Sequence, residues 1–203
     1  MMGYAWSTPA QCARYLHLPE ETKHVIDDDR YVHTGDMAKI DEDGFIFVTG
    51  RIKELIVTAG GENVAPAYIE NKIISICDCL SNVLVIGDKR KYLSCILTLK
   101  CKTDENGEST NVLNRDCQLV NQKIHSEAKT IEDVIQDPKW TEYIDSVMNE
   151  YNQKYAISRA QYIRKWVLLK RDFSIADGEL TTTMKIKRNV VYEHFSDSIE
   201  QLY

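Results

Sequence analysis

Three cations stand close together near the C-terminal end of the chain, directly after a run of hydroxyl side chains. The segment 181–188 reads Thr-Thr-Thr-Met-Lys-Ile-Lys-Arg. A lysine on a mobile loop can bring a compact positive charge to a phosphate group. A solvated basic patch is the plain alternative, but the beginning of a helix is an unfavourable place for cations because the helix dipole is positive there. This mismatch favours a function for the segment.

A carboxylate follows a glycine in the sequence Tyr-Val-His-Thr-Gly-Asp, which ends at Asp36. At the beginning of a strand such a carboxylate can accept two hydrogen bonds. The 2′ and 3′ hydroxyls of a ribose are natural donors, as in dinucleotide sites. The alternative is that Asp36 caps a turn, and from these residues alone that outcome is the more frequent one, because aspartate is a common turn residue.

The elements that would hold these side chains begin with a hairpin. Two strand-like runs, 37–41 and 45–50, flank Glu-Asp-Gly, and Asp-Gly is a strong hairpin signal. A third apolar run, 54–60, ends at two glycines that permit a tight loop. Ala65-Pro66 then predicts a helix, since proline suits the first turn, with Glu70 near its positive end.

The other elements follow from apolar periodicity. A short helix or surface loop is expected within 10–29, strands at 82–88, 93–100 and 162–169, a flexible insertion at 103–115, two helices after it, a loop at 171–183 and a final helix at 187–202. The second of the two helices begins at Asp137-Pro138 and carries an apolar stripe at steps of three and four, which predicts a core face rather than a ligand site. The stripe comprises Trp140, Ile144, Val147, Met148 and Tyr151. Strands with helices between and after them predict an α+β fold.

Composition excludes several classes of function. The chain of 203 residues is 43% apolar, which is enough for a core, and its net charge of −6 argues against a dedicated nucleic-acid-binding protein. Its six scattered cysteines form no Cys-x-x-Cys pair, so free thiols are expected and no metal site is predicted. No apolar run approaches the roughly 18 residues of a transmembrane helix, and the N-terminus does not read as a signal peptide.

In combination, the motifs resemble the adenylate-forming superfamily. Thr-Gly-Asp, Asp-Gly-Phe, Gly-Arg-x-Lys-Glu-Leu-Ile and Gly-Glu-Asn-Val before a proline follow one another in the first third of the chain. More narrowly, RIKELIVTAGGENVAP and RDFSIADGELTTTMKIKR are similar to segments of the bubblegum-type long-chain fatty acyl-CoA synthetases. The similarity runs over essentially the whole chain, and the motifs are specific as a set.

The resemblance implies that the chain is the C-terminal portion of such an enzyme. Residues 1–52 would be the end of an incomplete large AMP-binding domain. Residues 53–203 would form a mobile lid, an α+β domain with a small mixed sheet and flanking helices. Lys53 matches the hinge position about which the lid turns.

The resemblance also implies roles for individual side chains. Asp36 matches the carboxylate that binds the ribose of AMP, and Arg51 matches the arginine beside the nucleotide. Lys185 matches the catalytic lysine that reaches into the ATP site. Lys187 lies two residues further on and is the residue most easily mistaken for Lys185.

The implied reaction has two steps. A fatty carboxylate attacks the α-phosphate of ATP to give an acyl-adenylate and pyrophosphate, while Lys185 offsets the developing charge. Magnesium assists through the phosphates, with its protein ligands in the large domain. The lid then turns and presents the loop of Gly60, Gly61 and Glu62, and the thiol of coenzyme A attacks the acyl carbonyl.

Two departures bear on activity. Many relatives carry a lysine where this chain has Val57, and the glycine- and hydroxyl-rich phosphate loop of the large domain does not occur here. Little or no ligase activity is therefore expected of the chain alone. A separate large domain or a full-length synthetase is the expected partner, and fatty acid, ATP and coenzyme A are the expected substrates. A cytoplasmic location is implied, with peripheral attachment to the endoplasmic reticulum or another membrane left open.

Two other functions are left open by the sequence. One is a non-catalytic module that binds a partner through the surface that would face the large domain, which a large exposed apolar patch on residues 1–60 would support. The other is a nucleotide-binding domain unrelated to ligation. Its nucleotide affinity would depend on Asp36 but not on Lys185.

Overall fold

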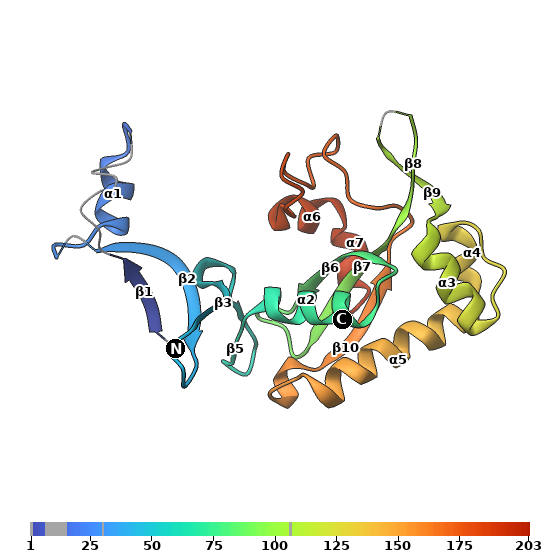
Figure 1. The fold of residues 1–203 in the computed structure, drawn as a ribbon, viewed down its shortest axis with the longest axis horizontal. Helices are drawn as coiled ribbons and strands as arrows, with labels where there is room; N and C mark the ends of the chain where they lie inside the picture. Colours follow the sequence, from blue (N-terminus) through green and yellow to red (C-terminus); the bar gives the residue numbers. More distant parts are fainter. Residues whose placement is uncertain (1, 7–15, 30, 106) are drawn as a thin grey trace. The chain divides into compact units, whose positions relative to one another are not determined.

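The computed structural model describes residues 2–6, 16–29, 31–105 and 107–203. By its internal contacts the chain divides into two units, Met1–Leu55 and Ile56–Tyr203, as can be followed in Figure 1. The described cysteines, which are Cys77, Cys79, Cys95, Cys101 and Cys117, are free thiols. Cys12 lies outside the described residues.

The first unit contains a three-stranded antiparallel sheet in the order β1-β2-β3. Its strands are Met2–Trp6, Val32–Ile40 and Ile46–Arg51, and the helix α1, Pro19–Val25, precedes β2. The hairpin predicted at 37–50 is confirmed. Its turn is closed by the side chain of Asp41, whose Oδ1 accepts the N–H groups of Asp43 and Phe45 at 3.1 and 2.8 Å. The sequence analysis assigns no element to the first residues of the chain, so β1 is an addition to it.

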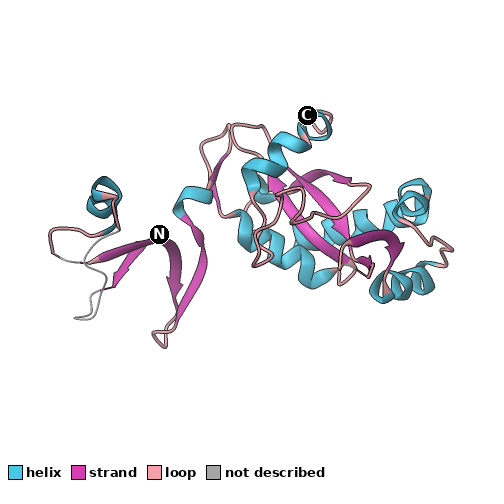
Figure 2. Cartoon of the chain, turned by 90° about the horizontal axis from the view of Figure 1, so that it is seen from above, coloured by secondary structure: helices cyan, strands magenta, loops and turns pink. Residues whose placement is uncertain are grey.

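The second unit has an α+β fold around a mixed sheet in the order β10-β7-β6. Strand β6, Leu80–Ile86, is antiparallel to β7, Leu93–Leu99, and β10, Ile163–Leu168, is parallel to β7. Its described helices are α2 Pro66–Ile76, α3 Arg115–Ile124, α4 Ile131–Gln136, α5 Pro138–Lys154, α6 Arg188–His194 and α7 Ser196–Glu200, with a 3-10 turn η2 at Arg159–Gln161. Figure 2 shows the helices gathered around these strands.

The two faces of this sheet bury different side chains. Because successive residues of a strand point to opposite faces, Val83 and Val85 of β6 join the core formed with α2 and α5. Leu84 and Ile86 point the other way and join a second core with α6, α7 and the loop before them. Residues 83–86 are apolar without alternation because both faces of the strand are covered.

Helix α5 confirms the predicted buried stripe, from Trp140 to Tyr151. Asp137 caps it, because its Oδ1 accepts the N–H of Lys139 at 2.9 Å. The indole N–H of Trp140 donates to Asn121 Oδ1 at 2.8 Å, and Asn121 Nδ2 donates to the carbonyl of Ala128 at 2.6 Å. A single buried amide therefore connects α5 to α3 and to the segment that follows α3.

Replacing this amide gives a first testable prediction. Asn121→Ala leaves the Trp140 N–H and the Ala128 carbonyl without these partners, and a buried unsatisfied polar group costs about 1–3 kcal/mol. We expect the free energy of unfolding, measured with urea, to fall by at least that amount. Gln122→Ala, at an exposed neighbour, serves as control and should change it by less than about 0.5 kcal/mol. Equal unfolding midpoints for the two variants would contradict the stabilising role of the Asn121 amide.

Four elements differ from the sequence analysis. The expected insertion at 103–115 contains most of a hairpin of β8, Cys101–Thr103, and β9, Ser109–Leu113. Three helices follow it rather than two, because the capping box of Thr130 and Asp133 begins a separate short helix, α4. The expected final helix is interrupted at Phe195 and continues as α7. The expected strand 54–60 shrinks to β4, Ile56–Val57, which pairs with β5, Asn63–Val64.

Candidate functional site

Lys185 lies near the tip of a small loop that folds back on itself. Leu180 and Ile186 form an isolated antiparallel bridge at its base. Above it, the N–H of Thr181 donates to the carbonyl of Lys185 at 2.8 Å, and the N–H of Lys185 donates to Thr181 Oγ1 at 3.0 Å. Met184 closes the turn with a φ of 60°. The backbone around Lys185 is therefore fixed.

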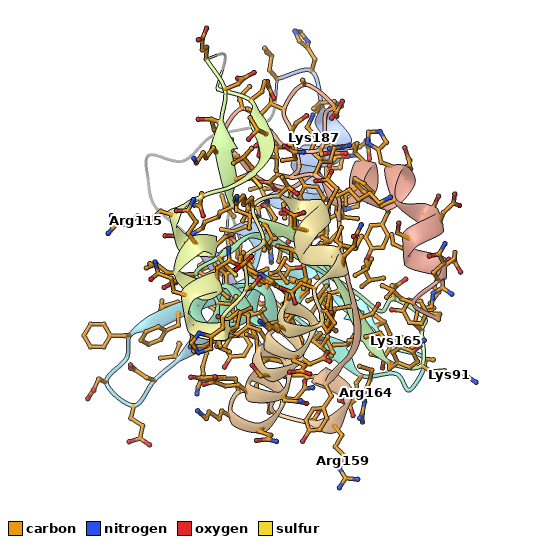
Figure 3. The ribbon with its side chains drawn as sticks, turned by 90° about the vertical axis from the view of Figure 1, so that its right-hand side faces the viewer. Lys91, Arg115, Arg159, Arg164, Lys165 and Lys187 are labelled. Carbon is orange, nitrogen blue, oxygen red and sulfur yellow. The ribbon has the colours of Figure 1, made fainter. Side chains whose placement is uncertain are left out.

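The side chain of Lys185 is exposed and, within the described residues, makes no hydrogen bond or ion pair. Lys187, labelled in Figure 3, is also exposed. Both lysines are free to meet a ligand. The sequence alone does not separate them, but only Lys185 is placed in the turn, while Lys187 stands at the base of the loop, next to α6.

Arg188, the third cation of the segment 181–188, binds a carboxylate within the protein. Its Nη1 and Nη2 donate to Glu70 Oε1 and Oε2 at 2.9 and 2.6 Å, and Glu70 Oε1 also accepts the N–H of Val85 at 2.7 Å. Glu70 is therefore part of a buried ion pair, and it lies just beyond the first turn of α2. This pair ties the segment after Lys185 to α2 and β6.

A second buried carboxylate, Glu179, lies on the other side of the loop. Arg171 Nη1 and Nη2 donate to its Oε2 and Oε1 at 2.7 and 2.6 Å, and the N–H of Ser174 donates to Oε2 at 3.1 Å. His194 Nδ1 lies 3.0 Å from Oε1. Burial raises the pKa of Glu179, but the hydrogen bonds from Arg171, His194 and Ser174 outweigh it and lower the pKa below the ordinary value.

This lowered pKa gives a second prediction. A carboxyl group with a depressed folded-state pKa contributes stability above its ordinary value of 4.5, and that contribution is lost as the pH falls through the lowered value. Glu179→Gln should therefore be less stable than the unchanged chain at pH 7, and the difference should shrink below pH 4.5. Urea unfolding of both proteins from pH 7 to 3 measures it. A difference that is independent of pH would count against the charged network.

Asp36 and Arg51 are brought together in the first unit. They are paired directly across β2 and β3, and Arg51 Nε lies 3.3 Å from Asp36 Oδ1. Asp36 lies inside β2 rather than at a turn, so the turn-cap alternative is wrong. An open hollow of about 1030 Å³ next to them is lined by Gly35, Arg51 and Lys53, among others. A guanidinium that lines a hollow and is paired with a carboxylate suits the phosphate and hydroxyl groups of a nucleotide.

Lys53 lies in a 3-10 turn, η1, at Ile52–Glu54. This turn directly precedes the division between the two units at Leu55 and Ile56. The side chain of Lys53 is exposed. A cation at the junction of two units is compatible with the expected hinge position, which stays a prediction.

The loop of Gly60 and Gly61 is tight, as expected. Gly61 has a φ of 79°, and its N–H donates to the carbonyl of Thr58 at 2.8 Å. Glu62 Oε2 accepts a hydrogen bond from Ser158 Oγ at 3.0 Å. The basic turn 89–91 lies alongside β4, since the N–H of Lys89 donates to the carbonyl of Val57 at 2.8 Å.

Across residues 2–6, 16–29, 31–105 and 107–203, no three or more His, Cys, Asp and Glu side chains are placed to hold a metal ion. None of the helices described is both long and apolar enough to cross a membrane.

Comparison with solved structures supports the adenylate-forming type of fold. The A domain of a carboxylic acid reductase from Segniliparus rugosus, solved with AMP and a co-purified carboxylic acid, matches with a TM-score of 0.71 at 18% identity, over 98% of this chain and 27% of that one. The adenylation domain of a carboxylate reductase from Mycobacterium chelonae matches with a TM-score of 0.67 at 20% identity, over 94% of this chain and 26% of that one.

Comparison with curated proteins gives closer similarity. The chain is 45% identical to the long-chain-fatty-acid–CoA ligase ACSBG2 of Gallus gallus over 93% of its own length and 25% of the relative's. It is 42% identical to ACSBG1 of Mus musculus over 93% of its own length and 26% of the relative's. It thus spans about a quarter of these relatives. The family model for the AMP-binding enzyme C-terminal domain matches residues 53–167, and the chain belongs to that family.

Proposed function

We propose that this chain is the C-terminal part of a long-chain-fatty-acid–CoA ligase and supplies its lid. The observation that supports this most directly is the 45% identity to a ligase of that name over 93% of the chain. On this proposal residues 53–203 are the lid and residues 1–52 are the end of the large domain. The match of the lid family model from residue 53 supports that division.

In the first half-reaction Lys185 would be the catalytic residue. Its ammonium group is exposed on a turn whose backbone is fixed, so it can enter a site formed by another part of the enzyme. There it would offset negative charge that develops at the α-phosphate of ATP as the fatty carboxylate attacks. Asp36 would accept hydrogen bonds from the ribose, and Arg51 would lie beside the nucleotide.

In the second half-reaction the lid would turn about Lys53 and present the loop of Gly60, Gly61 and Glu62 to coenzyme A. The left-handed backbone at Gly61 keeps this loop narrow, which suits the close approach of a pantetheine chain. ATP and coenzyme A would be substrates held mainly by the large domain. Magnesium would be bound there too, through the phosphates of ATP.

A partner-binding module is the second candidate, and one observation favours it. Apolar side chains of β3 and its turn are exposed, among them Phe45 and Val48 at 65% and 69%. In the ligase proposal the rest of the large domain covers these side chains. In the alternative a separate protein covers them.

Reconstitution tests the ligase proposal. The chain is purified alone and also mixed with the separately expressed large domain of the chicken relative. Acyl-CoA formation is then followed with fatty acid, ATP, magnesium and coenzyme A. We expect the chain alone and the large domain alone to be inactive or nearly so, and the mixture to form acyl-CoA.

Two results would count against the proposal. Acyl-CoA formation by the chain alone would show that it needs no large domain. An inactive mixture in which both parts are folded and bound to each other would instead favour the partner-binding module.

A further inference from the structure

Glu179 is a buried carboxylate to which the proposed reaction gives no role. Its side chain is 0% exposed, whereas the guanidinium-bearing side chain of Arg171 that binds it is 45% exposed. Burial of a charged carboxylate is costly unless it is paired and hydrogen-bonded, and a packed apolar side chain would serve stability as well or better. The presence of a charge here calls for another explanation.

The contacts of Glu179 connect three segments at the base of the Lys185 loop. Arg171 follows β10, Ser174 begins the loop, and His194 belongs to α6. The backbone of Glu179 takes part as well, because its carbonyl accepts the N–H of Lys187 at 2.7 Å. Glu179 therefore joins the strand before the loop to the helix after it, at the point where the two arms of the loop meet.

The opposite end of the loop is tied independently. Arg188 is held by Glu70, on α2, and does not depend on Glu179. With both ends fixed, the turn that carries Lys185 has little freedom to pivot. With only the Arg188 end fixed, the arm that includes Thr181 could swing, and the ammonium group of Lys185 would move with it.

We propose that Glu179 is a positioning residue for Lys185. Its carboxylate, held by Arg171, Ser174 and His194, fixes the arm of the loop that presents Lys185 to the phosphates. This inference rests on the proposed function of Lys185. It predicts that Glu179 matters for acyl-adenylate formation and not for the thioester-forming step, in which the loop of Gly60 and Gly61 faces the substrate instead.

Hydrogen–deuterium exchange on this chain tests whether Glu179 fixes the loop that carries Lys185. Glu179→Gln keeps the shape of the side chain and removes its charge. We expect the amides of Thr181, Lys185 and Lys187 to exchange at least about 10-fold faster in this variant, since their hydrogen bonds close the loop. The amides of α5 should stay protected, which shows that the unit is folded. Glu193→Gln, at an exposed residue of α6, is the matched control and should leave all three amides unchanged.

Separate assays of the two half-reactions test whether Glu179 affects acyl-adenylate formation alone. In the reconstituted mixture, Glu179→Gln should slow ATP–pyrophosphate exchange by roughly 10- to 100-fold, since misplacing a catalytic group by about 1 Å can cost that much. Transfer of the acyl group from supplied acyl-adenylate to coenzyme A should stay within about 2-fold of the unchanged chain. Glu193→Gln should alter neither rate.

Each outcome decides a different point. Equal losses in both half-reactions would reduce Glu179 to a structural role and overturn the inference. Unchanged amide exchange in Glu179→Gln would overturn it as well. A mixture that is inactive even with the unchanged chain would refute the proposed function, and with it the predicted effect on acyl-adenylate formation. The exchange experiment would still decide whether Glu179 orders the loop.

Discussion

Lys185→Ala is expected to lower the rate of acyl-adenylate formation by roughly 10²- to 10³-fold, the usual effect of removing one group that stabilises developing charge. The reason is that the ammonium group is the only part of this turn that can deliver a full positive charge, while the turn itself is fixed by Thr181. ATP–pyrophosphate exchange in the reconstituted mixture measures this step alone.

Lys187→Ala is the matched control for this prediction. Both residues are exposed lysines of the same segment, so a loss of general electrostatic attraction would affect both variants equally. We expect Lys187→Ala to change the exchange rate by less than about 5-fold, because an exposed charge contributes only modestly at a distance. A larger loss for Lys187→Ala than for Lys185→Ala would show that the two lysines have been assigned the wrong way round.

Arg188→Ala should have the largest effect on stability. It leaves the buried carboxylate of Glu70 without its bidentate partner, and breaking a buried pair in this way costs about 3–5 kcal/mol. Urea unfolding of this chain measures the loss. Arg159→Ala, at an exposed arginine that Figure 3 shows pointing outward, should change the free energy of unfolding by less than about 0.5 kcal/mol.

A double variant tests whether the charges of Glu70 and Arg188 are themselves needed for stability. Glu70→Leu with Arg188→Met replaces both charges by apolar side chains of similar size. It should recover part of the stability that Arg188→Ala loses. Apolar replacements of buried pairs are often neutral, but here the N–H of Val85 also loses its acceptor. If Arg188→Ala is no less stable than Arg159→Ala, the ion pair does not hold the segment after Lys185 in solution.

Much of the fold follows from local signals in the sequence. The hairpin of β2 and β3 is marked by Asp-Gly, and α5 is marked by its cap and its apolar stripe. The hairpin of β8 and β9 was missed because its strands are short and polar, and such strands lack the alternation that distinguishes a half-buried strand from a loop. β1 was missed because its partner β2 lies far along the chain.

The candidate site was predicted less completely than the fold. The segment of Lys185 is marked by a local pattern of hydroxyls and cations. No local pattern marks Glu70 and Glu179, the two carboxylates that hold the ends of its loop. Glu70 and Arg188 are 118 residues apart, and no local rule relates such a pair. One signal was present in α2, where Glu70 falls at helical spacing with the buried residues Pro66 and Ile73, so a charge on the apolar face called for a buried partner.

The most direct test of the central claim is a chimera in which this chain replaces the matching C-terminal quarter of the chicken ligase. The measurement is fatty-acid-dependent acyl-CoA formation by the purified chimera, with and without Lys185→Ala. We predict an active chimera that loses most of its activity with this substitution. A folded chimera without activity, or one whose activity is indifferent to Lys185→Ala, would contradict the claim that this chain is a ligase lid.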